Sequence, residues 1–243
     1  MSSGLTRVRA INFRCLKDVT VDLRPVSVFF GGNGAGKSTL LDLIWFVRDC
    51  AIRGAIEAAS TRSHGIGLRW DGAEEGSPVV VGLDTESVSY QLEAGFSSGR
   101  MEPFVGECLT EGDVTLLVRH IGADRARFSG AEKGLRAPEK TGLSQLVNGD
   151  APPPSAVTFD HLLHRVRRFN SRDLNFYKLR TFGSETSHHV RLSPSADNLW
   201  SVLRNLNDSR DVDERYSWIM DQMRRAFPLF QAMAFSQTGN SSV

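Results

Sequence analysis

The stretch Gly31-Gly32-Asn33-Gly34-Ala35-Gly36-Lys37-Ser38-Thr39 fits the pattern G-x-x-x-x-G-K-[ST], which defines the phosphate-binding P-loop. A short β-prone run, residues 26–30, precedes it, and an apolar run, residues 40–47, follows it. A strand, a glycine loop and a helix in this order form the context in which the motif binds phosphate. The sequence therefore predicts a strand over 26–30 and a helix to about Arg53, or through Ala59 if Gly54 is tolerated.

The chemistry expected of this loop follows from its geometry. Glycines let the backbone turn tightly, so that successive N–H groups point into one concavity at a helix N-terminus, where the helix dipole favours an anion. Lys37 should reach the β- and γ-phosphates of a nucleotide, and Thr39 should place a hydroxyl near the α-phosphate. The Ser38 hydroxyl should ligate Mg²⁺, a hard cation that prefers oxygen. The predicted cofactors are therefore ATP and Mg²⁺.

The sequence around the loop resembles that of a known protein family. Asn33 followed by Gly-Ala-Gly-Lys-Ser-Thr resembles the P-loop of ABC-type ATPases. Upstream, the run I-N-F-R-C-L-K-D at residues 11–18 and V-D-L at 21–23 resemble the strand pair that opens the SMC/RecF-like branch. The resemblance is strong over roughly residues 5–49. It continues weakly at 192–206 and 224–230, which are similar to predicted bacterial AAA family ATP-binding proteins of this branch.

This resemblance implies a fold, a site and a mechanism. The fold would be α/β: a P-loop NTPase, an ABC-ATPase-like head, with an antiparallel β element and a helical lobe. Lys37 would be catalytic, Ser38 would hold Mg²⁺, and the nucleotide would be bound by Asn33, Gly34, Ala35, Gly36, Lys37, Ser38, Thr39 and Arg14. Two heads would sandwich two ATP molecules, as a homodimer or with a partner ATPase or effector subunit. The implied setting is bacterial DNA maintenance or anti-phage defence.

Composition bounds the class of protein. The chain has 243 residues, of which 40% are apolar and 23% charged, with a formal net charge of +1. These values are typical of a soluble globular chain, and the net charge does not by itself indicate a nucleic-acid partner. No run of 18 or more apolar residues occurs, so we expect no membrane span. Cys15, Cys50 and Cys108 fit neither a zinc pattern nor a disulfide framework, which favours a reducing cytoplasm.

The pattern along the chain suggests three parts. Residues 1–59 would form the N-terminal part of the nucleotide-binding core, opening with two or three strands over 5–30. Residues 60–150 would form a β-rich lobe, an antiparallel meander with strands over 79–83, 87–92, 104–109 and 114–119. Residues 151–243 would form a helical lobe, set off by a linker at the three prolines 152–154. Within it we expect helices over 160–169, 197–206 and 211–227, and a short strand over 176–179. Asp160 would cap the first helix, residues 211–214 would form a capping box for the third, and Phe227 would face inward from it.

An ABC-type ATPase also needs a strand ending in Asp-Glu, a signature loop and usually a switch histidine. Residues 128–133 resemble the signature loop, residues 79–84 are the one strand-like run that ends in an acid, and His64 lies in a candidate loop. We interpret them instead as an accidental loop, an exposed strand end and a solvated histidine, because their context does not fit. The prediction is that the C-terminal half of the ATPase core is missing from this chain.

Three alternatives remain open at this point. The chain is a nucleotide-binding switch or truncated fragment that does not hydrolyse ATP, or it is a small-molecule or nucleoside kinase, since kinases also use P-loops. The third is a nucleic-acid-binding module that uses a basic cluster at 165–180 with interleaved aromatic residues. That cluster consists of Arg165, Arg167, Arg168, Arg172, Lys178 and Arg180, together with Phe169, Phe176 and Tyr177.

Overall fold

A computed structural model describes residues 4–97, 99–170, 174–185, 188, 190–209, 213–238 and 241–242. Arg172, one of the six members of the predicted basic cluster, lies outside the described residues. The chain divides into two compact units, Met1–Val166 and Arg167–Val243. We describe each unit by itself.

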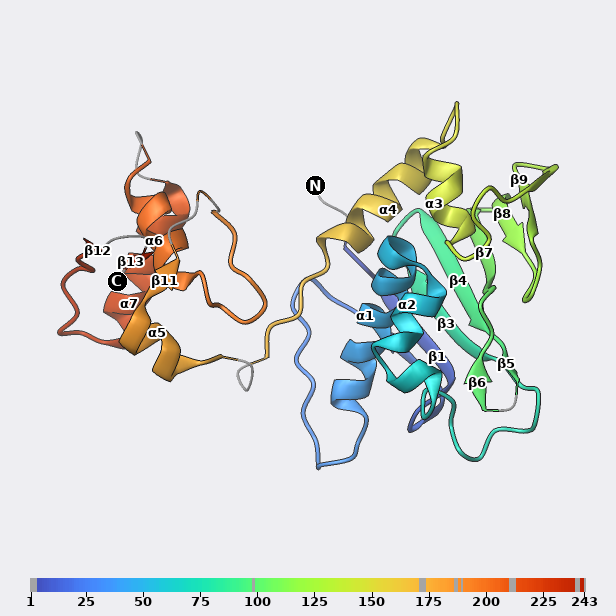
Figure 1. The fold of residues 1–243 in the computed structure, drawn as a ribbon, viewed down its shortest axis with the longest axis horizontal. Helices are drawn as coiled ribbons and strands as arrows, with labels where there is room; N and C mark the ends of the chain where they lie inside the picture. The colour runs from blue at the N-terminus through green and yellow to red at the C-terminus, as the bar shows by residue number, and fades with distance from the viewer. Residues whose placement is uncertain are drawn as a thin grey trace. The chain divides into compact units, whose positions relative to one another are not determined.

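Unit 1 is built on one eight-stranded sheet in the order β10-β9-β8-β7-β4-β3-β1-β2 (Figure 1). All neighbouring strands run antiparallel. The strands are β1 (Arg7–Phe13), β2 (Leu16–Asp22), β3 (Val79–Asp84), β4 (Val88–Ala94), β7 (Gly106–Glu111), β8 (Val114–Arg119), β9 (Arg125–Phe128) and β10 (Ala131–Gly134). A separate two-stranded hairpin joins β5 (Phe96–Ser97) to β6 (Arg100–Met101). The mixed α/β class and the antiparallel meander are thus confirmed.

The predicted border at residue 59 does not divide this unit. β1 pairs with β2 on one side and with β3 on the other, so the strands before the P-loop and those after residue 60 share one sheet. They also share one hydrophobic core, which contains Phe13, Phe46 and Leu92, all fully buried. Alternation along β3 and β4 places every second side chain in this core.

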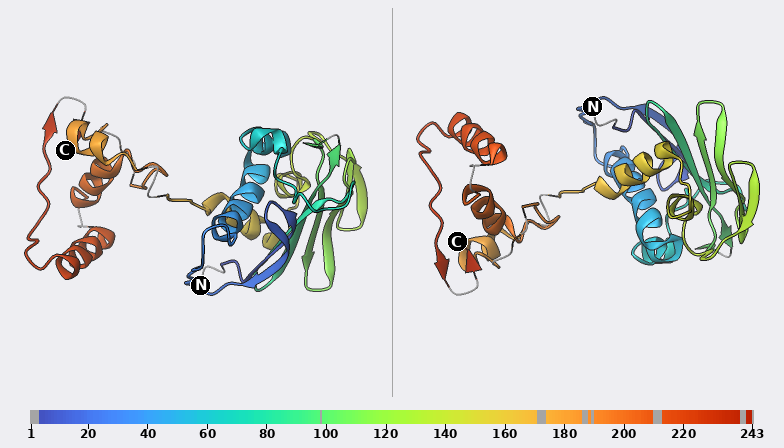
Figure 2. Two further views of the ribbon diagram at one scale, coloured as in Figure 1. Left: turned by 90° about the horizontal axis from the view of Figure 1, so that it is seen from below. Right: turned by 90° about the horizontal axis from the view of Figure 1, so that it is seen from above.

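Helices of unit 1 cover one face of the sheet (Figures 1 and 2). They are α1 (Lys37–Arg53), α2 (Ala55–Ser60), α3 (Gly142–Val147) and α4 (Pro154–Arg165), with a 3-10 turn η1 (Ser63–Gly65). The predicted helix after the P-loop is confirmed. It ends at Gly54, whose φ of 97° breaks the helical path before α2 begins.

The predicted strand over 26–30 is wrong. The side chains of Val26, Val28 and Phe30 are 81%, 79% and 93% exposed, and Phe29 alone packs against the core. The backbone of residues 26–30 makes no hydrogen bond to other backbone groups in the described part of the chain. A strand needs a neighbour to pair with, and the eight-stranded sheet has none beside this segment.

The predicted linker at 152–154 and the helix cap at Asp160 are also wrong. Pro154 is the first residue of α4, a position where proline is favoured because its missing N–H would have no partner there. Asp160 therefore lies inside the helix. α4 buries Phe159 and Leu163 in unit 1, and the Phe159 ring contacts Tyr90 with centroids 5.3 Å apart. The chain divides after Val166 instead.

Unit 2 contains α5 (Phe176–Phe182), α6 (Leu199–Asn207) and α7 (Glu214–Ala226), with short strands β11 (Ser184–Glu185), β12 (Gln237–Thr238) and β13 (Ser241–Ser242). Both later helices are confirmed, and they meet through Val202, Leu206, Tyr216 and Met220. The predicted strand at 176–179 is wrong. This segment begins α5 because the Asn175 side chain accepts a hydrogen bond from the Lys178 N–H and caps a helix.

Two further expectations for unit 2 need correction. Phe227, expected to face inward, is 61% exposed, because α7 ends at Ala226 and the chain turns to an extended conformation there. The capping residue of α7 is Asp213, whose side chain accepts from the Arg215 N–H; residues 211 and 212 lie outside the described part. Among the described helices, none has the length and apolar character that a membrane span requires.

Candidate nucleotide-binding site

The P-loop enters α1 through a left-handed glycine. Gly36 has φ 86°, and a Cβ at this position would lie 2.8 Å from the Cδ2 atom of Leu16 in β2. Only glycine combines this backbone angle with so close an approach. The hairpin turn between β1 and β2 is therefore pressed against the loop, and Cys15 in that turn places its Sγ 3.4 Å from the Thr39 Oγ1.

The loop presents a set of unused backbone donors. In the described part of the chain, the N–H groups of Lys37, Ser38 and Thr39 donate to no acceptor, and no side chain caps the helix. These groups lie at the start of a 17-residue helix, where the dipole adds partial positive charge. An anion placed there would gain several hydrogen bonds at once.

The side chain of Lys37 is held over the loop by backbone carbonyl groups of the loop. The Nζ atom donates to the carbonyl oxygens of Gly31 at 2.9 Å and Gly32 at 2.7 Å. The ammonium group is thus fixed at the first two residues of the loop. The Ser38 hydroxyl makes no hydrogen bond to any described residue, so its oxygen is available to a cation. This donor set fits a nucleotide phosphate with a bound Mg²⁺.

Arg14 lies in the turn between β1 and β2, with φ 51°. Its Nη2 atom lies 3.1 Å from the Oδ2 atom of Asp42, which follows Ser38 by one helical turn on α1. The side chain of Arg14 is 40% exposed, whereas that of Asp42 is 11% exposed. The structure therefore places Arg14 beside the second turn of α1 and pairs it with a carboxylate.

The structure also shows an ion network that sequence reasoning missed. Arg62, only 6% exposed, lies 3.6 Å from Asp42 and 3.1 Å from Asp49, and Arg48 lies 3.0 Å from Asp49. The Arg62 guanidinium also sits 5.4 Å from the centre of the Phe46 ring. Residues 42, 46 and 49 follow each other by four and three positions, so they share one helix face. The sequence could therefore have shown that two acidic residues share a face of α1, although not that Arg62 packs against it.

The other candidates lie elsewhere. Asp84 pairs with Arg7 at the opposite end of β1 from the turn that touches the P-loop, and its Oδ1 atom accepts from the Ser89 hydroxyl. The run 128–133 spans the hairpin between β9 and β10, with Ser129 and Gly130 as its two-residue turn. Neither Asp84 nor this hairpin belongs to the P-loop site, which agrees with our interpretation of both as incidental.

His64 is placed in η1 with φ 57° and lines a cavity of about 300 Å³ with residues of α2 and β6, among them Ile56, Arg100 and Met101. A larger cavity, of about 460 Å³, lies at the ends of β2 and β3 and is lined by residues that include Asp22, Asp84 and Glu86. Neither cavity is lined by P-loop residues. Residues 31–35 of the loop are exposed, which suits recognition by backbone N–H groups and one lysine.

Comparison with known proteins points to the same segment. Residues 5–56 match the family model described as an AAA ATPase domain, which spans β1, β2, the P-loop and α1. A stretch of 40 residues is 48% identical to the OLD nuclease of Thermus scotoductus, and covers 16% of this chain and 8% of that protein. The chain thus matches only a small part of that relative's length. The similarity supports an ATPase-type P-loop in the N-terminal segment.

Proposed function

We propose that this chain binds Mg²⁺-ATP through residues 33–39 and forms part of an ATPase. The observation that carries the proposal is the P-loop itself. Lys37 Nζ donates to two loop carbonyls, and three backbone N–H groups at the start of α1 donate to no acceptor among the described residues. The similarity of residues 5–56 to an AAA ATPase domain supports nucleotide use, typically with Mg²⁺.

Each residue of the site has a role in this proposal. The backbone of Asn33, Gly34, Ala35 and Gly36 wraps the phosphates, and Lys37 neutralises charge that develops on the γ-phosphate during transfer. Ser38 would hold Mg²⁺, which would supply positive charge against the phosphates. The Thr39 hydroxyl contacts the α-phosphate. Arg14, held by Asp42, offers guanidinium N–H donors at the same end of α1.

The finer assignment rests on the resemblance to the SMC/RecF-like branch. On that assignment, ATP binding closes a dimer of heads, either as a homodimer or with a partner ATPase, and hydrolysis reopens it. The dimer would control an effector in bacterial DNA maintenance or anti-phage defence. In the described residues no Asp-Glu strand end lies beside the P-loop, so hydrolysis would draw its acidic residues from a longer chain or a partner. A switch that binds ATP without hydrolysing it is the second candidate.

The test is ATP binding and turnover by the same protein. Wild-type chain is titrated with Mg²⁺-ATP and assayed for phosphate release, beside Lys37→Ala. Lys133→Ala on β10 is the matched control, because it removes a lysine from the opposite edge of the sheet. We expect wild type and Lys133→Ala to bind ATP and Lys37→Ala to bind at least about tenfold more weakly.

Turnover that disappears in Lys37→Ala would mean that this chain alone holds a complete ATPase site. Binding without turnover supports nucleotide binding at this loop, and is expected both of a switch and of an ATPase whose acidic residues lie on a longer chain or a partner. Equal binding by all three proteins, or no binding by wild type, contradicts nucleotide binding at this loop.

A further inference from the structure

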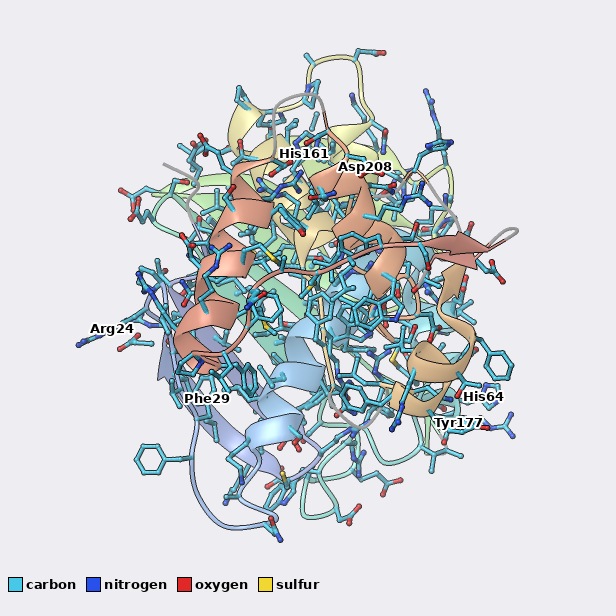
Figure 3. All side chains as sticks on the ribbon, turned by 90° about the vertical axis from the view of Figure 1, so that its left-hand side faces the viewer. Arg24, Phe29, His64, His161, Tyr177 and Asp208 are labelled. Atoms are coloured by element: carbon cyan, nitrogen blue, oxygen red, sulfur yellow. The ribbon has the colours of Figure 1, made fainter. Side chains whose placement is uncertain are left out.

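Helix α5 of unit 2 exposes three aromatic rings. Phe176 is 66% exposed, Tyr177 73% and Phe182 63%; Tyr177 is labelled in Figure 3. The rings of Tyr177 and Phe182 meet edge to face with centroids 6.5 Å apart. Large aromatic side chains usually contribute their area to a core or an interface. Here all three rings are instead exposed to solvent on one seven-residue helix.

In the sequence of α5, two cationic residues lie between the aromatic ones. Lys178 and Arg180 are exposed and form no ion pair within the described part of the chain, and α5 contains no acidic residue. Three of the four arginines of α6 and α7 are paired instead. Arg204, Arg215 and Arg224 each lie within 3.1 Å of a carboxylate oxygen. Among the described residues, no carboxylate pairs with the two cations of α5, which favours an anionic partner.

The inner side of α5 holds this surface in place. Leu179 is 4% exposed, and its carbonyl accepts a hydrogen bond of 2.9 Å from the Trp200 Nε1–H of α6. The Asn175 cap fixes the first turn of the helix. A helix anchored on one side presents its outer side chains with little further loss of conformational entropy on binding.

We propose that the α5 surface, formed by Phe176, Tyr177, Lys178, Arg180 and Phe182, binds single-stranded nucleic acid. Exposed rings stack on unpaired bases, and neighbouring cations neutralise the phosphates between them. In a duplex the faces of the bases are stacked on neighbouring base pairs, so the rings cannot stack on them. A protein partner would use the rings and Arg180 but not Lys178, because lysine is depleted at protein interfaces, whereas single-stranded nucleic acid uses the rings and both cations.

Two exposed arginines precede α5 in the same unit. Arg167 and Arg168 begin unit 2, and Phe169 beside them is 54% exposed. They extend the basic and aromatic character along the chain toward α5. The α5 surface lies in unit 2, whereas the P-loop lies in unit 1, so this inference does not depend on ATP binding.

The test measures the fluorescence anisotropy of a labelled oligothymidylate of about 20 nucleotides as the full chain is added. It is done without ATP and at salt concentrations from about 50 to about 200 mM. We expect Tyr177→Ala to weaken binding roughly 5- to 150-fold, the range found for one stacked base. Tyr177→Trp, which keeps a ring, should bind as well as wild type. Lys178→Glu with Arg180→Glu should lower the slope of log affinity against log salt by about 1.4.

The matched control is Trp218→Ala, which removes an exposed ring, 64% accessible, from α7 rather than α5. It should leave affinity unchanged. The proposal is overturned if wild type does not bind at low salt, or if the matching duplex binds as tightly as the single strand. Loss of binding in Trp218→Ala equal to that in Tyr177→Ala also overturns it. So does a change in molar mass by light scattering in Tyr177→Ala, which would make α5 a self-association surface.

Discussion

At the residue scale, Gly36 decides how closely the β1–β2 turn approaches the P-loop. Its φ of 86° and a Cβ contact of 2.8 Å to Leu16 predict that Gly36→Ala distorts the loop. A left-handed alanine alone costs about 1–2 kcal/mol, and the clash adds to this. We expect ATP affinity, measured by titration, to fall at least about tenfold.

Gly32→Ala is the control for this prediction. A Cβ at Gly32 meets no atom within 4 Å, and its φ is not in the left-handed region. Gly32→Ala should therefore change ATP affinity far less than Gly36→Ala. Equal effects of the two substitutions would show that steric fit at Gly36 does not shape the site.

Arg62 is the second residue whose role only the structure reveals. It bridges Asp42 and Asp49 while 6% exposed, so Arg62→Met leaves two nearly buried carboxylates with one partner fewer. Removing one member of a buried ion pair typically lowers the free energy of unfolding by about 3–5 kcal/mol. Urea denaturation should show a loss of this order.

Arg7→Met gives the comparison for Arg62→Met. Arg7 pairs with Asp22 at 2.7 Å, but both side chains are more than half exposed. Exposed pairs contribute about 0–1 kcal/mol, so this variant should unfold close to wild type. A similar loss in both variants would mean that burial does not set the strength of the Arg62 network.

At the element scale, a buried polar network joins α3 to the sheet. Glu107 of β7 accepts from the Tyr90 hydroxyl at 2.7 Å, from the N–H groups of Gly142 and Leu143 at the start of α3, and lies 3.6 Å from Arg119. Burial raises the pKa of Glu107, and burial followed by the nearby Glu107 charge raises the pKa of Tyr90 well above its usual value.

The raised pKa of Tyr90 predicts loss of stability at alkaline pH. In the folded chain Tyr90 keeps its proton above pH 10, whereas in the unfolded chain it ionises near pH 10. Its contribution is therefore complete below about pH 10, and each further pH unit lowers the free energy of unfolding by about 1.4 kcal/mol.

Denaturant titrations between about pH 9 and pH 11 test this linkage. Tyr90→Phe should be less stable than wild type at the lower pH, because Glu107 loses a hydrogen-bond donor. Its stability should then fall less steeply as the pH rises. Parallel curves for the two proteins would contradict the assignment.

At the scale of the whole molecule, the chain divides after Val166 rather than at the prolines. A fragment ending at Val166 should unfold cooperatively, because it keeps the eight-stranded sheet and all four helices that cover it. A fragment ending at Asp150 lacks α4 and exposes the core that Ala156, Phe159 and Leu163 cover. We expect it to lose several kcal/mol or to fail to fold, as followed by circular dichroism and urea titration. Equal stability of the two fragments would place α4 outside unit 1.

The sequence by itself determined the features that depend on local pattern. The P-loop and α1 follow from a glycine motif beside an apolar helical run, and the end of α1 follows from Gly54. The meander from β3 to β8 follows from alternating residues between turn signals. Such patterns work because the period of the side chains and the backbone freedom of glycine are properties of the chain itself.

Only the tertiary structure decided the features that depend on a distant partner. Residues 26–30 are β-prone in sequence but have no neighbouring strand among the described residues. Residues 176–179 lie in a helix whose Leu179 carbonyl accepts a hydrogen bond from the Trp200 ring of α6. The ion network around Arg62 joins residues far apart in the sequence. Strand pairing, burial of charge and exposure of aromatic rings depend on what the fold places beside each residue, so no local pattern specifies them.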